Sequence, residues 1–358
     1  MADAPLGPPS AGLPTGKLPP ALLKQLVLGR LGARRPETLV RAGLGIDAAA
    51  VRFGDWACVL KTDPITTAGA GAGGLAVHVA CNDLAAMGAE PLGVLATLLF
   101  PAGVATETIE RMVAEIDAAA RALNVEVLGG HTEVAPGLTA PLVVMASVGR
   151  ARPHTLVTAA GARPGDALVL TKAAALEGTS ILAHDFAARL APLVPAAALA
   201  EARAYRAEIS VVPEGLLAAR LGATAMHDPT EGGVLGALWE MAEASHTGFR
   251  VEEALIRVRP PTRAICAALG VDPLRLIASG ALLIACPDGA GMARALAERG
   301  IEAAVIGAMT AGERALVRSD GTTTAVPTVD RDELYRLLAE SAGDAGDAGD
   351  AGDAGDAG

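Results

Sequence analysis

One carboxylate inside an apolar run restricts the possible structures of this sequence more than any other feature. The segment 74–81 is mostly apolar and predicts a buried helix, and Asn82 and Asp83 follow it directly. A charged side chain in such surroundings is costly unless a metal ion or a cationic partner neutralises it. We therefore expect Asp83 to be a paired or metal-binding carboxylate inside the fold.

Two further aspartates lie upstream in segments that favour short loops. Asp47 follows Gly45 and Ile46, and Asp63 precedes Pro64, which favours an extended backbone at Asp63. Each aspartate is also an ordinary choice for a turn or a cap. Together with Asp83, however, they suit Mg²⁺, which binds a few carboxylates and the phosphate oxygens of a substrate. The sequence therefore indicates a Mg-nucleotide site.

Two glycine-containing segments are weaker candidates. Gly129 and Gly130 follow a predicted strand, so their N–H groups would be able to approach a phosphate, although a tight turn needs the same glycines. Asp228 lies in the loop 227–233, directly before a predicted helix. It is a candidate for catalysis or for capping that helix.

Composition excludes several classes of function. The 358 residues are 51% hydrophobic and 2% aromatic, with a net charge of −11, and no basic patch with interleaved aromatics indicates nucleic-acid binding. The longest apolar run, 92–105, contains Pro101 and is too short to span a membrane. The first residues lack a basic start and an apolar core, and the four cysteines lack zinc-ligand spacing. We expect a cytoplasmic protein with reduced, mostly buried thiols and no nucleic-acid or membrane partner.

The expected strands and helices alternate, which predicts an α/β protein. Residues 1–16 are rich in Pro, Gly and Ala and predict a flexible lead-in. We expect a first domain over 17–153 and a second over 154–330. Residues 341–358 consist almost entirely of Ala-Gly-Asp repeats, which offer nothing to bury and predict a disordered tail.

Considered together, these segments resemble the aminoimidazole ribonucleotide (AIR) synthase superfamily, which includes PurM, HypE, thiamine-monophosphate kinase and selenophosphate synthetase. The resemblance covers roughly residues 17 to 320 and implies a two-domain PurM-like fold of the α/β (α+β) class. It also implies a homodimer in which the N-terminal domains share a β-barrel and Mg-ATP lies in a cleft at that interface. The matching motifs, in chain order, are Gly45-Ile46-Asp47, Thr62-Asp63, Asn82-Asp83, Gly88-Ala89-Glu90-Pro91, Gly129-Gly130-His131-Thr132, Asp228-Pro229-Thr230-Glu231-Gly232-Gly233 and Ser279-Gly280-Ala281-Leu282-Leu283.

Within the superfamily, the sequence is most similar to the hydrogenase maturation branch, HypE. Glu231 replaces the arginine of the HypE pattern Asp-Pro-Thr-Arg-Gly-Gly, and His131 stands where HypE has an acidic residue, for which Glu133 would compensate. HypE carries its reacting group on a C-terminal cysteine, whereas the last cysteine here is Cys286. Dehydration on a tail cysteine is therefore not expected.

The resemblance implies transfer of the γ-phosphoryl group of ATP to an amide or carbonyl oxygen of a small-molecule or protein-bound amide substrate. Two alternatives stay open: a small-molecule kinase similar to thiamine-monophosphate kinase, and a catalytically silent nucleotide-binding assembly partner. The implied metal ligands are Asp47, Asp63 and Asp83. The implied nucleotide contacts are those three with Lys61, Asn82, Gly129, Gly130, Thr132 and Glu133, and the implied catalytic residues are Lys17, Asp228 and His131.

Overall fold

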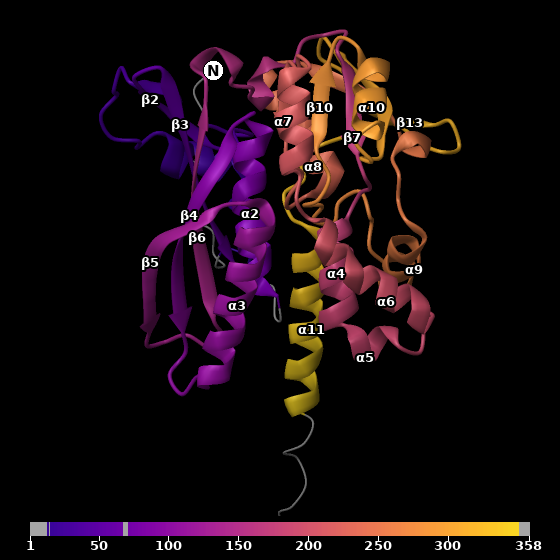
Figure 1. Cartoon of the computed structure of the whole chain (residues 1–358). Helices are drawn as coiled ribbons and strands as arrows, with labels where there is room; N and C mark the ends of the chain where they lie inside the picture. The colour runs from indigo at the N-terminus through magenta and orange to yellow at the C-terminus, as the bar shows by residue number, and fades with distance from the viewer. Residues whose placement is uncertain (1–12, 14, 67–70, 351–358) are drawn as a thin grey trace, which may run out of the picture.

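A computed structural model describes residue 13 and residues 15–66 and 71–350 of the chain. It has two mixed α/β halves, each built on one sheet, which lie side by side (Figure 1). Most of the predicted lead-in, residues 1–12 and 14, lies outside the described residues. No helix in the described part of the chain is long and apolar enough to cross a membrane.

The first sheet has six strands in the order β1-β2-β3-β6-β4-β5, antiparallel except for the parallel pair β4–β5. Helices α2 and α3 pack on one face, where Val77, Ile116 and Met145 join one core. Figure 1 shows these helices between the sheet and the second half. The elements are β1 (Thr38–Val40), β2 (Ala49–Phe53), β3 (Trp56–Ile65), α2 (Ala72–Ala86), β4 (Glu90–Phe100), α3 (Thr106–Leu123), β5 (Glu126–Val134) and β6 (Leu142–Ala151).

This sheet is open within one chain. Strand β5 is exposed along its whole length at one edge. Several large apolar side chains on β4 and β5 are also exposed, namely Leu92, Leu95, Val127, Leu128 and Val134. The shared barrel implied by the resemblance would need a second chain and stays a prediction.

The second sheet has seven strands in the order β13-β12-β9-β11-β7-β10-β8, antiparallel except for β9–β12. Leu168 and Leu170 of β7 pack on the face covered by α8, and Val169 packs on the face covered by α10. Burial of both faces explains the nearly continuous apolar run of β7. The elements are β7 (Ala167–Thr171), β8 (Ala225–His227), α8 (Gly233–Ser245), β9 (Gly248–Glu252), β10 (Leu283–Cys286), α10 (Gly289–Ala297), β11 (Ala303–Thr310), β12 (Arg314–Val317) and β13 (Thr323–Ala325).

The remaining helices form a third layer of packing. Helices α4, α6, α9 and the start of α11 share a separate core that includes Leu182, Leu199, Ile265 and Leu334. These helices are α4 (Leu176–Asp185), α5 (Ala187–Leu190), α6 (Ala196–Ala204), α7 (Val212–Arg220), α9 (Pro260–Leu269) and α11 (Glu333–Asp350). The short elements are α1 (Pro20–Leu23), the π-helical η1 (Lys24–Leu28), and the 3₁₀ turns η2 (Pro153–Thr155), η3 (Ala159–Gly161), η4 (Tyr205–Glu208) and η5 (Glu253–Leu255).

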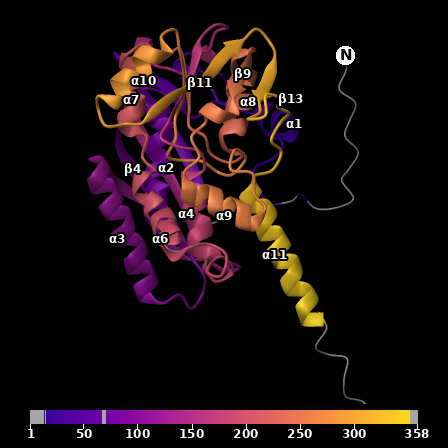
Figure 2. The same ribbon diagram turned by 90° about the vertical axis from the view of Figure 1, so that its right-hand side faces the viewer.

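Helix α11 extends to Asp350 and projects away from the body of the protein (Figure 2). Its start packs in a core through Leu334 and Leu337, whereas the Ala-Gly-Asp repeat offers no apolar side chain larger than alanine. The disorder of the repeat stays a prediction. Residues 351–358 lie outside the described residues.

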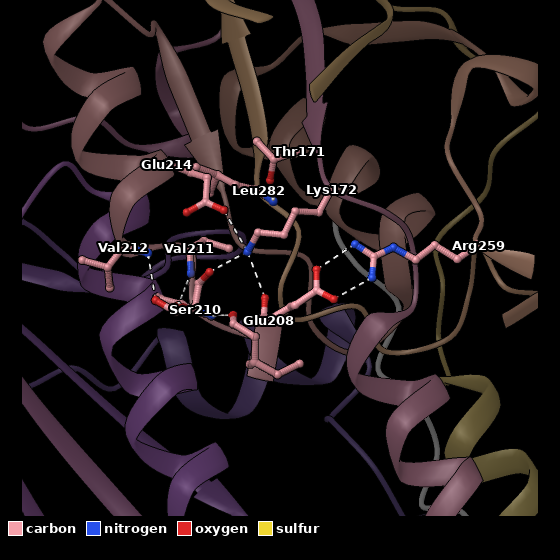
Figure 3. A network of polar contacts seen from close by, with 11 residues as sticks. Thr171, Lys172, Glu208, Ser210, Val211, Val212, Glu214, Arg259 and Leu282 are labelled. Carbon is pink, nitrogen blue, oxygen red and sulfur yellow. Dashed lines mark hydrogen bonds and ion pairs between the residues drawn. The ribbon is translucent and has the colours of Figure 1, made fainter. Parts of the chain in front are cut away.

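Hydrogen bonds of Asn82 to Ile209 and Val211, called the latch below, join the two halves. Asn82 on α2 donates a hydrogen bond from Nδ2 to the carbonyl of Ile209 (2.8 Å), and its Oδ1 accepts one from the N–H of Val211 (2.8 Å). From the other side, Lys172 Nζ donates to the carbonyls of Glu208 (2.9 Å) and Ser210 (2.6 Å) (Figure 3). The loop before α7 is thus fixed by residues from both halves.

Lys172 is itself neutralised within this network. Its Nζ lies 2.8 Å from Oε1 of the buried Glu214, and Arg259 holds the Glu208 carboxylate through two 2.7 Å hydrogen bonds (Figure 3). Helix α7 also approaches α2 closely, because a Cβ at Gly215 would lie 2.3 Å from the carbonyl oxygen of Ala85. These contacts set the relative position of the two halves, and hence the shape of the cleft between them.

Candidate active site

A cavity of about 460 Å³ lies between the two halves. The first half supplies Lys17, Lys61 and Asp63, and the second half supplies Thr230 and Glu231. An adjoining hollow of about 540 Å³ shares several of these residues and extends towards Glu240 and Asp332. The other residues that line the first cavity are Thr15, Gly16, Pro64, Ile65, Thr66, Val79, Glu177, Ile277, Ser279 and Tyr335.

Lys61, Asp63 and Asp83 meet on one wall of the cleft. Lys61 and Asp63 are two residues apart on β3 and therefore point to the same face, against which α2 packs. Lys61 Nζ lies 3.3 Å from Oδ2 of Asp63 and 3.2 Å from Oδ1 of Asp83. The prediction that Asp83 is buried is confirmed, and Lys61 is its cationic partner.

The pKa values of Asp83 and Lys61 are both raised in this cluster. Burial raises the pKa of Asp83 well above its ordinary value, although the Lys61 ammonium opposes the shift. Burial alone would lower the pKa of Lys61, but the carboxylates of Asp83 and Asp63 outweigh it and raise that pKa. One oxygen of Asp83, Oδ2, is buried without a hydrogen-bond partner among the described residues.

A buried histidine links Asp47 to the second half. Nδ1 of His227, the last residue of β8, lies 2.5 Å from Oδ1 of Asp47, and its Nε2 lies 2.7 Å from Oε2 of Glu240 on α8. Burial alone would lower the pKa of His227, but the two carboxylates raise it to about 10. The loop of Asp47 approaches α8 so closely that a Cβ at Gly45 would lie 2.7 Å from the carbonyl oxygen of Glu240. Glycine at this position, with φ +69°, makes the contact possible.

Several buried polar atoms near the cleft lack a hydrogen-bond partner in the described part of the chain. Both carboxylate oxygens of Asp228 are in this state, as are Oδ2 of Asp47, Oε2 of Glu177 and Oγ of Ser279. Burial and the charge of Asp47 raise the pKa of Asp228 well above its ordinary value, and burial raises that of Glu177 to about 7. Buried polar groups are normally hydrogen-bonded, so this concentration of exceptions indicates a binding site.

Lys17 spans the cleft from the N-terminal segment. Its Nζ donates to Oγ1 of Thr230 (2.9 Å) and forms an ion pair with Oε2 of Glu231 (2.8 Å). Burial alone would lower the pKa of Lys17, but Glu231 and Glu240 raise it. The ammonium group therefore stays charged while it faces the cavity.

The aspartates and lysines of this site suit a magnesium ion bound together with a nucleotide better than a magnesium ion bound by protein side chains alone. Within the described residues, no three His, Cys, Asp or Glu side chains form a group able to hold a metal ion. Magnesium bound together with a nucleotide usually takes only one or two carboxylates, and phosphate and water oxygens complete its shell. The partnerless oxygens of Asp47 and Asp83, with two lysines nearby, match that requirement.

Comparison with known proteins gives the family. Residues 45–151 match the model of the AIR synthase related protein N-terminal domain, and residues 163–319 match that of its C-terminal domain. The chain is 32% identical to carbamoyl dehydratase HypE of Azotobacter vinelandii over 78% of this chain and 84% of that protein. The chain belongs to the AIR synthase-related, PurM-like family.

Two further relatives extend this finding. The HypE carbamoyl dehydratase of Rhizobium leguminosarum bv. viciae is 30% identical over 87% of this chain and 91% of that protein. The crystal structure of hydrogenase maturation protein HypE in complex with ATP superposes with a TM-score of 0.67 at 25% identity, covering 88% of this chain and 96% of that one. The expected two-domain PurM-like α/β fold is therefore confirmed, with two mixed sheets.

One expected nucleotide contact of this AIR synthase-related chain has another role in the structure. Asn82 is fully buried, and both ends of its amide are used by the latch to Ile209 and Val211. In this structure the amide is therefore engaged by the second half, and the expected contact of Asn82 with a phosphate or a metal-bound water stays a prediction. The backbone groups of the second half compete for the amide, and the apolar surroundings of α2 leave it no solvent.

Gly129 and Gly130 lie inside strand β5 and not in a turn, and a Cβ at Gly130 would be 1.8 Å from the carbonyl oxygen of Ala96 on β4. Gly130 therefore permits close strand pairing in this AIR synthase-related chain. The expected contact of these glycines with a phosphate stays a prediction. His131 and Glu133 are exposed on the same strand and contact each other (Nε2 to Oε2, 3.1 Å).

Strand β5 lies apart from the cleft within one chain. Strands β6 and β4 separate it from β3, which carries Lys61 and Asp63. None of Gly129, Gly130, His131, Thr132 and Glu133 lines either cavity. Lys17, Lys61 and Asp63 line the cavities, and Asp83, Asp47 and Asp228 lie behind them, close enough to interact with Lys61. The β5 residues lie outside this group.

Sequence reasoning missed four residues of the site: His227, Glu240, Glu177 and Ser279. Glu177 follows the apolar run 173–176, so it shows the pattern that drew attention to Asp83. His227 directly precedes Asp228 and ends a fully buried strand. A search for isolated polar residues in apolar runs would have found Glu177.

Proposed function

We propose that this protein is a Mg-ATP-dependent enzyme of the HypE type, which transfers the γ-phosphoryl group to an amide or carbonyl oxygen of an acceptor. The observation that carries the proposal is the interdomain cavity. Lys17, Lys61 and Asp63 line this cavity, and beside it Asp47 and Asp83 each keep one buried oxygen that has no hydrogen-bond partner among the described residues. Phosphoryl transfer requires mainly positioning and charge neutralisation, which such a site provides.

The residues divide between the two reactants. Asp47, Asp63 and Asp83 would hold the metal ion, which would neutralise phosphate charge when bound. Lys61, fixed between Asp63 and Asp83, would contact the phosphates, and Lys17 would contact the transferring group once it leaves Glu231. Asp228 is buried in the second half, near Asp47 and Lys61, and its two oxygens have no hydrogen-bond partner in the described part of the chain. Its raised pKa suits a general acid–base role.

The names of the relatives support an amide-type acceptor and a role in hydrogenase maturation. Proteins 30–32% identical to this chain are named carbamoyl dehydratase HypE, and the one solved with ATP is a hydrogenase maturation protein at 25% identity. We infer that the acceptor carries an amide-type oxygen and that the protein acts in the maturation of a hydrogenase.

We further infer a homodimer built on the open face of the first sheet. Leu92, Leu95 and Leu128 are exposed there, and β5 offers an unpaired edge. A second chain would cover these side chains. The exposed His131 and Glu133 of one chain would then lie at the interface, where the resemblance puts the nucleotide cleft.

One observation favours a second candidate, a catalytically silent nucleotide-binding assembly partner. Asn82 is committed to the latch between the halves and is not available to a phosphate. A silent protein would still bind Mg-ATP but would not turn it over.

The deciding experiment is incubation of the protein with Mg-ATP, with and without amide acceptors, followed by separation of ADP, AMP and phosphate. Formation of ADP that depends on an acceptor and is lost in Asp228→Asn supports the enzyme. Mg-ATP binding without any turnover supports the silent partner. Absence of Mg-ATP binding contradicts both.

A further inference from the structure

The wall of the cavity that the second half supplies contains a buried carboxylate beside a hydroxyl group. Burial raises the pKa of Glu177, and the neighbouring hydroxyl and N–H of Ser279 oppose that shift. Glu177 Oε2 and Ser279 Oγ are nevertheless buried without a well-formed hydrogen bond among the described residues. Both residues line the cavity of about 460 Å³. A buried carboxylate oxygen without a hydrogen-bond partner costs free energy. Its presence in this cavity therefore indicates that a bound ligand donates the missing hydrogen bond.

Both groups are held rigidly. Glu177 lies in the first turn of α4, and the N–H of Gly178 beside it donates to the carbonyl of Ile277 (3.0 Å). A Cβ at Gly178 would lie 2.4 Å from Cγ of Leu276, so the start of α4 packs tightly against the segment that carries Ser279. The pair is therefore preorganised before any ligand arrives.

The charges around the pair favour a cation. The two lysines of the cavity are already engaged, Lys17 with Glu231 and Lys61 with Asp63 and Asp83. Within the described ranges, no ion pair joins Glu177 to a basic side chain, whereas Glu231 and Asp332 lie near enough to raise its pKa. A phosphate or carboxylate at this wall would be repelled, and a cationic N–H donor would be attracted.

We propose that Glu177 and Ser279 bind a cationic N–H donor group of the acceptor, that is, an ammonium, amidinium or guanidinium group. This inference rests on the proposed function, because it assigns a second recognition element to the acceptor. The donor group occupies the second-half wall, and the phosphates lie at the part of the cavity lined by Lys17 and Lys61. The acceptor is thereby oriented across the cleft.

The test uses three small alkyl probes on the full-length protein: the cationic butylguanidinium, the neutral butyramide and the anionic butyrate. Ligand-observed NMR titration measures the dissociation constant of each. We expect butylguanidinium to bind, butyramide to bind at least tenfold more weakly, and butyrate not to bind. Glu177→Gln should weaken butylguanidinium binding at least tenfold, and Ser279→Ala should weaken it several-fold.

Glu298→Gln removes the same charge from an exposed position on the surface and should leave the dissociation constant unchanged. Equal binding of the three probes, or unchanged binding in Glu177→Gln and Ser279→Ala, would overturn the inference. A titration with Mg²⁺ alone is run in parallel. Magnesium binding that disappears in Glu177→Gln would assign the site to a metal ion and overturn it as well.

Mg-ATP binding to the same proteins separates this inference from the proposed function. Mg-ATP binding without butylguanidinium binding would overturn only the cationic site. Butylguanidinium binding that depends on Glu177, without Mg-ATP binding, would support the cationic site and contradict the proposed function.

Discussion

The imidazole of His227 and the carboxylate of Asp47 lie 2.5 Å apart, although 180 residues separate them in the chain. Glu240 contacts the other ring nitrogen at 2.7 Å, so one buried cation is shared by two acids from different halves. This contact fixes one carboxylate oxygen of Asp47, and the other has no hydrogen-bond partner among the described residues. His227 therefore both orients a proposed metal ligand and joins the halves.

Replacement of His227 tests this link. His227→Gln keeps a polar side chain but removes the positive charge, so the buried Asp47 loses its counter-ion. We expect a loss of about 3–5 kcal/mol in the free energy of unfolding at pH 7, the usual cost of breaking a buried ion pair on one side. Urea denaturation measures it. His246→Asn, at an exposed position with φ +54°, is the control, and equal losses in the two variants would refute the link.

Asp83→Asn distinguishes metal binding from structural pairing. Lys61 keeps Asp63 as a partner, and burial already favours the protonated form of Asp83, so the fold should lose less than about 1.5 kcal/mol. Mg-ATP affinity should fall at least tenfold, because a charged metal ligand is gone. Calorimetric titration beside urea denaturation checks both quantities, with the exposed Asp117→Asn as control. A large loss of stability with unchanged affinity would end the metal-ligand hypothesis for Asp83.

Asn82→Ala tests the latch between the halves. The change leaves the N–H of Val211 and the carbonyl of Ile209 without their partner, and each unsatisfied buried group costs about 1–3 kcal/mol. We expect a total loss of about 2–4 kcal/mol in the free energy of unfolding. Asn124→Gly, at the exposed left-handed end of α3, should change stability much less. If Asn82→Ala weakens only Mg-ATP binding and leaves stability intact, Asn82 is a ligand contact after all.

Glu177 predicts a pH dependence of stability with a defined sign. Its pKa rises from 4.5 to about 7 on folding because the carboxyl group is buried, so the folded protein holds an additional proton between these values. The contribution of Glu177 to stability is therefore present at low pH and is lost as the pH rises through about 7. Above that pH, Glu177→Gln should be more stable than the parent by about 3 kcal/mol.

Urea denaturation at pH values on both sides of this window checks the prediction. The difference between Glu177→Gln and the parent should grow from acid to neutral pH, whereas Glu298→Gln should follow the parent throughout. Parallel curves for Glu177→Gln and the parent would show that the carboxyl group titrates normally.

The proposed dimer predicts a solution mass of about twice the chain mass of 35.8 kDa at micromolar concentration. Leu128 is 51% exposed on β5, and Leu128→Lys should produce a monomer because it puts a charge in an apolar interface. Light scattering after gel filtration measures both masses. The similarly exposed Leu193, outside the first sheet, provides the control Leu193→Lys. A monomeric parent protein would contradict the dimer.

Local features of the sequence predicted much of the part of the site that the first half of the protein supplies. The apolar run before Asn82 predicted a buried helix, and α2 spans Ala72–Ala86 with Asp83 buried. The alternation of strands and helices predicted the α/β class. Such inferences succeed because the periodicity of apolar residues reflects which face of an element is buried. Gly130 shows the limit of inference from local sequence, because a glycine that lies close to a neighbouring strand and a glycine in a turn cannot be told apart in the sequence.

Only the tertiary structure decided which partner each polar group takes. Asn82 finds its partners 127 and 129 residues away, Asp47 finds His227, and Asp83 finds Lys61. The sequence by itself determined that Asp83 would be buried and would need a counter-charge. Which counter-charge, and from which half, depends on how α2, β3 and β8 pack, because contacts between distant segments leave no periodic trace in the chain.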